Sequence, residues 1–221
     1  MGAQPKTDFI SEAEYRDIDA AAARKHEYLD GEYLDGGMWA MAGGSPKHAQ
    51  LIANVQATVV THLRGRSCYG TSGEQRVKTG ERGLQTYPDV AIICPLPRFD
   101  EENTDTLLNP RVLFEVLSSE LQSPSTRNWD RSGKFDHYKN IASLMDYVLV
   151  NQDWVRVEHF HRLPDESWAL RTYVRREDAL SIELPDGVLA LPLDEIYERL
   201  DLPEGLAPLP DDLNPENLER A

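Results

Sequence analysis

Apolar residues recur at helical spacing in two segments of the N-terminal half. Residues 11–14 read Ser-Glu-Ala-Glu, a capping box that predicts a short helix reaching the alanine run at 20–23. A longer helix is predicted over 45–65, with Ser45 as N-cap, Pro46 in the first helical position and Gly65 at the end. Its apolar positions are three or four residues apart: Leu51, Ile52, Val55, Val59 and Leu63.

Two nearly continuous apolar runs follow, YPDVAIIC at 87–94 and VLFEVLS at 112–118. Continuous rather than alternating apolar residues predict strands covered on both faces, as in the middle of an α/β sheet. The polar, proline-bearing stretch between them is expected to be an exposed connection. A weaker strand is predicted around 68–78, and Asp30-Gly31 marks the turn of a hairpin between two short apolar segments.

The second half of the chain predicts one helix, a β-meander and a last short helix. The first helix is expected over 128–142, the three strands at 145–152, 155–163 and 167–174, and the last helix at 193–200. From residue 201 the chain combines proline with acidic residues, which is typical of a poorly ordered tail. The predicted organisation is therefore one domain over 1–200 and an acidic tail over 201–221.

Composition excludes a membrane span and gives no reason for export. Hydrophobic residues make up 40% of the 221 residues, and no apolar run approaches the roughly 20 needed to cross a bilayer. The N-terminus has no apolar signal core, so a cytoplasmic location is expected. Cys68 and Cys94 lack the spacing of a zinc site or a disulfide framework, and both are expected to be small buried apolar residues.

The formal net charge of -15 argues against nucleic-acid binding, because phosphate recognition normally shows as a basic footprint. The charge is unevenly spread. Residues 201–221 hold six acidic side chains and one arginine, whereas residues 62–82 hold five basic and two acidic side chains. A basic edge can therefore exist on this acidic protein, although scattered basic residues are more often plain solvated surface.

A carboxylate lies within each of the two apolar strands, Asp89 in the first and Glu115 in the second. Burying an ionised carboxylate without a partner is costly, so such residues are mainly paired or bound to metal. If the strands are neighbours, two carboxylates at the same level can share one hard divalent cation. On the evidence of these two strands alone, each carboxylate could equally well belong to a buried salt bridge or lie at a strand end and face solvent.

The predicted helix over 128–142 adds a possible partner for these carboxylates. Asp130, Lys134 and Tyr138 are four residues apart and share one helical face. A lysine reaching from this face could orient an attacking water and offset charge on a pentavalent phosphate. The alternative is a surface pair of Asp130 and Lys134 worth about 0.3 kcal/mol.

The order of short motifs along the chain resembles the Uma2-type restriction endonuclease family, a branch of the PD-(D/E)xK nuclease superfamily. The motifs are DGE at 30–32, M-x-G-x-S-P-x-H at 41–48, YPDV at 87–90, FEVLS at 114–118, SPST at 123–126, D-R-x-x-K-x-x-x-Y at 130–138 and DYVLV at 146–150. The resemblance covers about residues 27–168. It implies a restriction-endonuclease-like core, an α/β fold with a central mixed β-sheet flanked by helices. It also implies Mg²⁺ or Mn²⁺, phosphodiester hydrolysis and a homodimer.

Carried over position by position, the resemblance makes Asp89 and Glu115 the metal ligands. The usual E-x-K motif would place a lysine at position 117, where this chain has Leu117. The lysine role then falls to Lys134, which is similar to the migrated-lysine arrangement of this family. Four residues, 119–122, stand between the FEVLS and SPST motifs and depart from the family pattern, which puts the position of Lys134 in question.

Four further residues are weaker candidates. Glu32 would be an additional acidic metal ligand and His48 would contact phosphate or water, although hairpin carboxylates and helix-start histidines are more often solvated or capping residues. Tyr138 is expected to pack against the site. Glu74, in the weaker strand, is the least supported.

Three functions fit these features. The first is a metal-dependent endonuclease acting on DNA, with Asp89, Glu115 and Lys134 as catalytic residues and His48 at the periphery. The second is a nuclease-derived binding module without turnover, which the acidic charge and the departure at 119–122 favour. The third is a metal-dependent hydrolase of small phosphoesters on the same scaffold.

Overall fold

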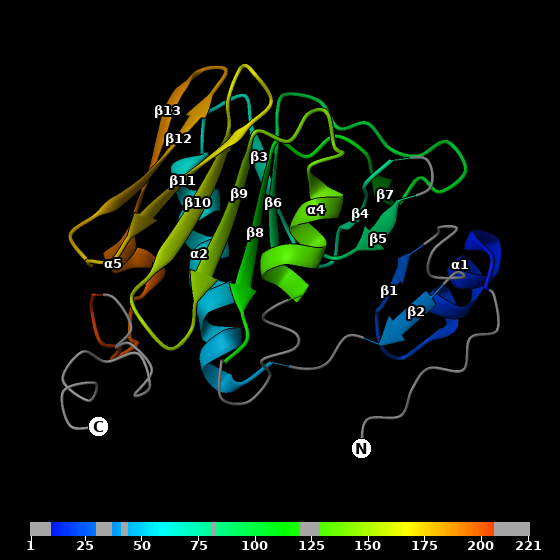
Figure 1. Ribbon diagram of the computed structural model, residues 1–221, viewed down its shortest axis with the longest axis horizontal. Helices are drawn as coiled ribbons and strands as arrows, with labels where there is room; N and C mark the ends of the chain where they lie inside the picture. Colours follow the sequence, from blue (N-terminus) through cyan, green and yellow to red (C-terminus); the bar gives the residue numbers. More distant parts are fainter. Residues whose placement is uncertain (1–9, 30–36, 41–43, 81–82, 120–128, 206–221) are drawn as a thin grey trace, which may run out of the picture.

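The computed structural model describes residues 10–29, 37–40, 44–80, 83–119 and 129–205. Its centre is a six-stranded sheet in the order β11-β10-β9-β8-β6-β3 (Figure 1). The strands are β3 (Tyr69–Ser72), β6 (Val90–Ile93), β8 (Val112–Leu117), β9 (Asp146–Asn151), β10 (Val157–Arg162) and β11 (Trp168–Tyr173). Because β8 and β9 run parallel while the other neighbours are antiparallel, the sheet is mixed.

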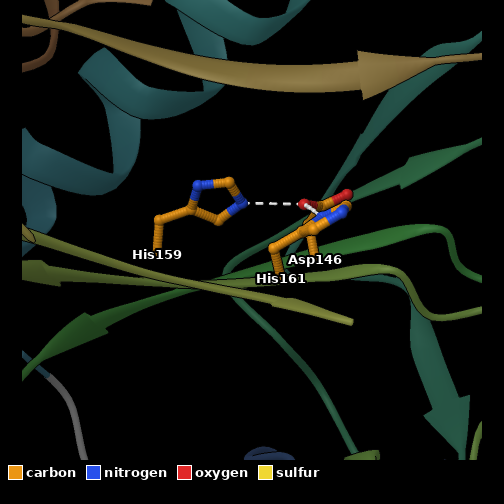
Figure 2. Close-up of side chains that lie close together, drawn as sticks. All are labelled: Asp146, His159 and His161. Atoms are coloured by element: carbon orange, nitrogen blue, oxygen red, sulfur yellow. Dashed lines mark hydrogen bonds and ion pairs between the residues drawn. The ribbon is translucent and has the colours of Figure 1, made fainter. Parts of the chain in front are cut away.

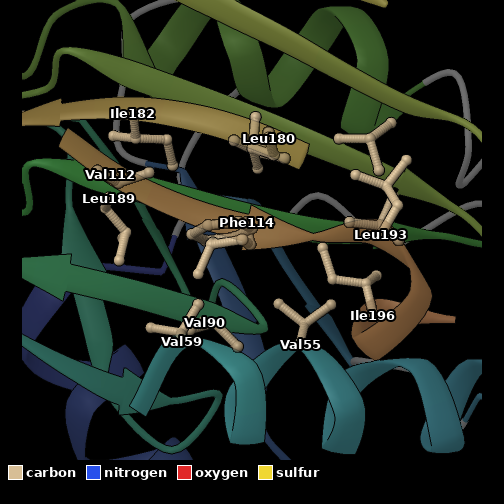
Figure 3. Close-up of a cluster of buried hydrophobic side chains, with 14 of the residues drawn as sticks. Val55, Val59, Val90, Val112, Phe114, Leu180, Ile182, Leu189, Leu193 and Ile196 are labelled. Carbon is tan, nitrogen blue, oxygen red and sulfur yellow. The ribbon is translucent and has the colours of Figure 1, made fainter. Parts of the chain in front are cut away.

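One face of this sheet is covered by α2 (Pro46–His62), the hairpin of β12 (Ala179–Leu184) and β13 (Gly187–Pro192), and α5 (Leu193–Ile196). Figure 3 shows their side chains converging on Phe114 of β8. Burial of each such side chain contributes roughly 1.5–3 kcal/mol relative to exposure. The start of α2 is fixed as its sequence predicts, since the Ser45 hydroxyl accepts the backbone amide of His48 and Pro46 follows.

The opposite face carries α4 (Lys134–Tyr138) and a smaller five-stranded sheet in the order β2-β1-β5-β4-β7. Its strands are β1 (His26–Leu29), β2 (Gly37–Ala40), β4 (Arg76–Lys78), β5 (Leu84–Thr86) and β7 (Thr106–Leu107), with α1 (Glu12–Ala21) beside β1. Figure 1 shows α4 beside β8, between the central sheet and the strands β4 and β5. The molecule is thus a mixed α/β fold whose central sheet is covered on both faces, which confirms the predicted fold class.

Most predicted elements are present. The capping box at Ser11 and Glu14 opens α1, and α2, β6, β8 and the meander β9-β10-β11 lie where the sequence predicts them. The last predicted helix, 193–200, is present as α5 but ends at Ile196. The hairpin near Asp30 is also formed, because β1 pairs with β2, while its turn lies outside the described residues. The predicted helix over 128–142 is shorter. It begins as a π-helix at Trp129–Gly133 and continues as α4.

Two predictions about the strands were incomplete, and three strands were missed. The segment 68–78 is two strands, β3 and β4, that belong to different sheets. The connection between β6 and β8 contains β7, whose Leu107 is fully buried. The short strand β5 and the hairpin of β12 and β13 are not predicted at all.

The prediction for the cysteines was wrong. Cys68 and Cys94 form a disulfide. They flank the antiparallel pairing of Tyr69 with Ile93, so the pairing of β3 with β6 brings them together. Cys68 is also buried in the core, but as half of a cross-link rather than as a free apolar side chain.

The described chain still contacts the core just beyond residue 200. Leu202 is buried, and the Pro203 carbonyl accepts the backbone amide of Val155. Residues 206–221, the greater part of the predicted tail, lie outside the described residues. No helix in the described ranges is long and apolar enough to cross a membrane.

Candidate functional site

Asp89 and Glu115 lie side by side on the face of the central sheet that carries α4. Glu115 is in the middle of β8, whereas Asp89 immediately precedes β6 rather than lying within the strand. The register pairs Val90 with Phe114, and its continuation sets position 89 opposite position 115. Residues opposite one another in antiparallel strands belong to the same face. Glu115 contacts Lys134 and Tyr138 of α4, and Asp89 accepts the backbone amide of Val116 in β8 at 2.7 Å.

Lys134 contacts three carboxylates of the site. Its Nζ lies 2.8 Å from Glu27, 3.0 Å from Asp130 and 3.4 Å from Glu115. The lysine is only 5% exposed, and Glu115 is 4% exposed. Tyr138, one turn further along α4, donates its hydroxyl to Glu115 at 2.8 Å. The four residues Glu27, Asp89, Glu115 and Asp130, together with Lys134, are called the carboxylate–lysine cluster below.

The π-helix ahead of α4 sets the position of this lysine. Its wider turn brings Trp129 over Gly133, where an added Cβ would lie 2.0 Å from the indole ring. Glycine is therefore required at this position for the indole to pack there. The Trp129 indole N–H donates to Glu27 at 3.2 Å, so the same turn holds a second partner of Lys134 in place.

Glu27 comes from β1, in the smaller sheet, and contacts Lys134 of α4. Its Oε1 accepts the Thr86 hydroxyl at 2.6 Å. The sequence prediction missed Glu27. The only available signal was a carboxylate next to the apolar residues Tyr28 and Leu29, and this does not distinguish a buried glutamate from a solvated one.

Burial dominates the electrostatics of Asp89, Glu115 and Asp130. It raises the pKa of all three carboxyls, and that of Glu115 well above its usual value, because Asp89 and Asp130 add to the effect. The Lys134 ammonium opposes this rise at each of them. Burial would also raise the pKa of Glu27, but the charge of Lys134 and the hydrogen bonds from Lys134, Thr86 and Trp129 hold it below its usual value.

The ammonium of Lys134 is strongly retained. Burial would lower the pKa of Lys134, but the neighbouring Glu115, Asp130 and Glu27 raise it well above its usual value. One lysine thus faces four carboxylates. Within the described residues, the cluster therefore has more carboxylates than ammonium groups, and buried negative charge without a partner is costly. Proteins bind hard cations at sites of this kind.

His48 lies at the rim of the cluster and contacts the strand rather than an open cavity. Its Nε2 is 2.8 Å from the Val116 carbonyl oxygen, and the Val116 amide donates to Asp89 at 2.7 Å. Gly44 makes room for the ring, since an added Cβ there would lie 2.3 Å from the imidazole Nδ1. His48 and Asp89 therefore contact the carbonyl and the amide of Val116, the residue after Glu115, in two successive peptide units of β8.

Two candidate residues remain, Glu32 and Glu74. Glu32 lies outside the described residues, as do residues 120–122 of the segment that departs from the family pattern. Glu74 is exposed and pairs with Lys25, so it does not join the cluster. Despite that segment, α4 brings Lys134 to Glu115.

The basic stretch at 62–82 does not form a free basic surface in the described part of the chain. Arg66 pairs with Asp186, Arg76 with Asp19, and Lys78 with both Glu12 and Asp100. The positive charge of these three side chains is therefore largely neutralised inside the protein. The expected basic edge is not supported by this arrangement.

A divalent cation fits the donors of the cluster. Within the described residues, no three of these carboxylates have oxygens that all lie within 4.8 Å of one another. A cation bound here would take one or two carboxylates and complete its shell with water. Mg²⁺ is usually bound in this way, because it dehydrates reluctantly.

The fold and the cluster define a nuclease-like α/β domain. A solved structure of a putative nuclease belonging to DUF820, from Anabaena variabilis, matches with a TM-score of 0.63 and 14% identity, covering 85% of this chain and 97% of that one. A model of the Uma2 family, described as putative restriction endonuclease, matches residues 13–193. The chain belongs to this family.

Two relatives come from Synechocystis sp., and both are named as uncharacterized. The protein slr1290 is 31% identical over 191 residues, which are 86% of this chain and 93% of the relative. The protein sll1609 is 29% identical over 164 residues, which are 74% of this chain and 87% of the relative. The similarity therefore spans nearly the whole length of both relatives.

Proposed function

We propose that the protein is a metal-dependent endonuclease that hydrolyses phosphodiester bonds of DNA and uses Mg²⁺ or Mn²⁺. The observation that carries the proposal is the carboxylate–lysine cluster, in which the buried Lys134 ammonium contacts Glu27, Asp130 and Glu115 within 3.4 Å. Membership of a family described as putative restriction endonuclease supports the reaction class.

Asp89 and Glu115 are the residues that would hold the cation. Both point to one face of the sheet, and burial raises the pKa of both, so a bound cation would relieve their mutual repulsion. When bound, a divalent ion at such a site polarises the phosphodiester and lowers the pKa of a water molecule. The Tyr138 hydroxyl holds one oxygen of Glu115 and so limits rotation of its carboxylate.

Lys134 acts as a cation rather than as a general base. Its pKa lies well above the usual value, so the amine keeps its proton at neutral pH. A fixed ammonium next to the reacting phosphate would stabilise the negative charge that develops in the transition state. Glu27 and Asp130 position this ammonium, and His48 contacts the Val116 carbonyl of β8.

Titration calorimetry with Mn²⁺ tests the metal assignment in wild type, Glu115→Gln and Asp89→Asn. We expect binding by wild type and its loss in both variants, because each removes one anionic ligand. Glu198→Gln is the matched control, since Glu198 is exposed and lies outside the cluster. Equal Mn²⁺ binding by wild type and by both cluster variants would overturn the assignment.

The second candidate is a binding module on the nuclease fold without turnover. Two observations favour it: Lys134 is already held by three carboxylates, and the basic stretch at 62–82 is largely paired within the protein. A module of this kind would bind a partner but would not cleave DNA with any metal. Absence of Mn²⁺ binding by wild type would favour this candidate.

DNA as the substrate, as opposed to a small phosphoester, and a homodimeric state are parts of the proposal. Cleavage of a small phosphodiester substrate without any nicking of DNA would replace DNA by the smaller substrate class. Light scattering after size-exclusion chromatography tests the dimer, and a mass near the 25.0 kDa of one chain would exclude it.

A further inference from the structure

A second group of ligand-type side chains lies on the other face of the central sheet. Asp146 begins β9, and His159 and His161 stand two residues apart on β10. The register sets His161 opposite Asp146 and His159 opposite Val148. Val148 belongs to the core under α2 and the β12-β13 hairpin, so the three side chains project away from the carboxylate–lysine cluster.

The three side chains point toward one another (Figure 2). His159 Nε2 and His161 Nδ1 each lie 2.7 Å from the same oxygen, Oδ1 of Asp146. One ligand atom from each residue lies within 4.8 Å of the others, and this is the only such group of three in the described ranges. The geometry is therefore that of three donors around one point.

Burial separates a closed side of this group from an open side. The side chain of Asp146 is fully buried and that of His159 is 7% exposed, whereas that of His161 is 33% exposed. An ion could enter past His161. Two ligands would then be fixed by the core and one would lie at the solvent boundary.

Hydrogen bonding within the group leaves the carboxylate incompletely satisfied. Both imidazoles converge on Oδ1, while Oδ2 of Asp146 is buried without a hydrogen-bond partner in the described part of the chain. A buried carboxylate oxygen without a partner costs free energy. A cation shared by the carboxylate and the two imidazoles would offset this cost.

We propose that Asp146, His159 and His161 bind one divalent transition-metal ion of the Zn²⁺ type. Two imidazole nitrogens and one carboxylate oxygen suit Zn²⁺ and its neighbours, whereas Mg²⁺ prefers oxygen ligands only. Three protein ligands would leave a further coordination position for water. This site is independent of the carboxylate–lysine cluster and of the proposed nuclease reaction.

Titration calorimetry with Zn²⁺ tests this site in the full-length protein, with excess Mg²⁺ present to occupy oxygen-only sites. We expect one Zn²⁺ per chain. His161→Asn and His159→Gln are the informative variants, because an amide placed near the lost ring nitrogen can still donate a hydrogen bond to Asp146 but is a poor metal ligand. Each should weaken Zn²⁺ binding by more than the roughly 10- to 100-fold that loss of a supporting outer-shell partner costs.

His62→Gln is the matched control, because His62 is a surface histidine paired with Glu195 and should leave Zn²⁺ binding unchanged. Glu115→Gln separates this site from the proposed nuclease site and should also keep Zn²⁺ binding. Co²⁺ bound to wild type should give visible absorption that His161→Asn abolishes. No Zn²⁺ binding by wild type, or equal binding by wild type and His161→Asn, would overturn the proposal.

Discussion

Replacement of Lys134 by methionine removes the one ammonium that three buried carboxylates share. Its Nζ contacts Glu27, Asp130 and Glu115 at 2.8, 3.0 and 3.4 Å, and the lysine is 5% exposed. Removing one partner of a buried ion pair typically costs about 3–5 kcal/mol, because the other charge stays buried without compensation. We therefore expect Lys134→Met to lower the free energy of unfolding by about 3–5 kcal/mol at neutral pH.

Urea unfolding of the metal-free protein, followed by far-ultraviolet circular dichroism, measures this loss. The transition midpoint should fall while the slope with denaturant stays the same, since the surface exposed on unfolding is unchanged. Lys139→Met is the matched control on the next turn. Lys139 pairs with Asp136 at 2.7 Å, and both side chains are exposed to solvent. A surface pair of this kind contributes less than about 1 kcal/mol. If both variants lose the same small amount, Lys134 does not neutralise the cluster.

Three further outcomes are expected. Burial raises the pKa of Glu115 well above its usual value, so the native state binds a proton that the unfolded chain has lost. The stability that this provides is fully present below the unfolded carboxyl pKa of about 4.3 and is lost as pH rises through the raised pKa. Metal-free wild type should therefore unfold at a lower urea concentration at pH about 8 than at pH about 5.5, and Glu115→Gln should reduce this difference. The same difference in midpoint for wild type and Glu115→Gln would contradict this. Gly133→Ala should cost about 1–3 kcal/mol, because the new Cβ meets the Trp129 ring, and should change the tryptophan emission; wild-type stability and emission would contradict the tight packing. The double variant Cys68→Ser with Cys94→Ser opens a loop of separation 26 and should lose about 3.5 kcal/mol in thermal or urea unfolding, whereas no loss would argue against the disulfide.

Local signals were sufficient for the elements with strong patterns. The N-cap at Ser45 and the apolar spacing after it predict α2, and the apolar run around Phe114 predicts β8. The hairpin of β12 and β13 was missed although Leu180, Ile182 and Leu184 alternate with exposed residues as a half-buried strand requires. That signal was available in the sequence.

Other features depend on contacts between distant residues and have no local signal. The strand β7 is two residues long, and only its pairing with β4 defines it. Cys68 and Cys94 meet because β3 pairs with β6, and neither residue carries a local sign of this. Glu27 reaches Lys134 only because the smaller sheet packs against α4.

The candidate site was predictable only in part, because some of its residues meet through contacts between distant parts of the chain. The sequence pointed to Asp89, Glu115 and Lys134, and the fold brings all three to one face of the central sheet. It did not indicate that Lys134 would be held by a carboxylate from β1. The Asp146 group was also missed, since its members become neighbours only when β9 pairs with β10. The catalytic and metal-binding roles of Asp89, Glu115 and Lys134 remain predictions.

The most direct test of the proposed function is the rate at which supercoiled plasmid DNA is nicked by wild type and by Glu115→Gln. Both proteins would be assayed with Mn²⁺ and with a chelator, after circular dichroism has shown that both are folded. Glu198→Gln, with its exposed carboxylate, serves as the control for loss of one negative charge. Nicking by wild type and the control only with metal, and its loss in Glu115→Gln, is the result expected of a nuclease site. Equal nicking by wild type and folded Glu115→Gln, or no nicking by wild type with any divalent metal, would contradict it.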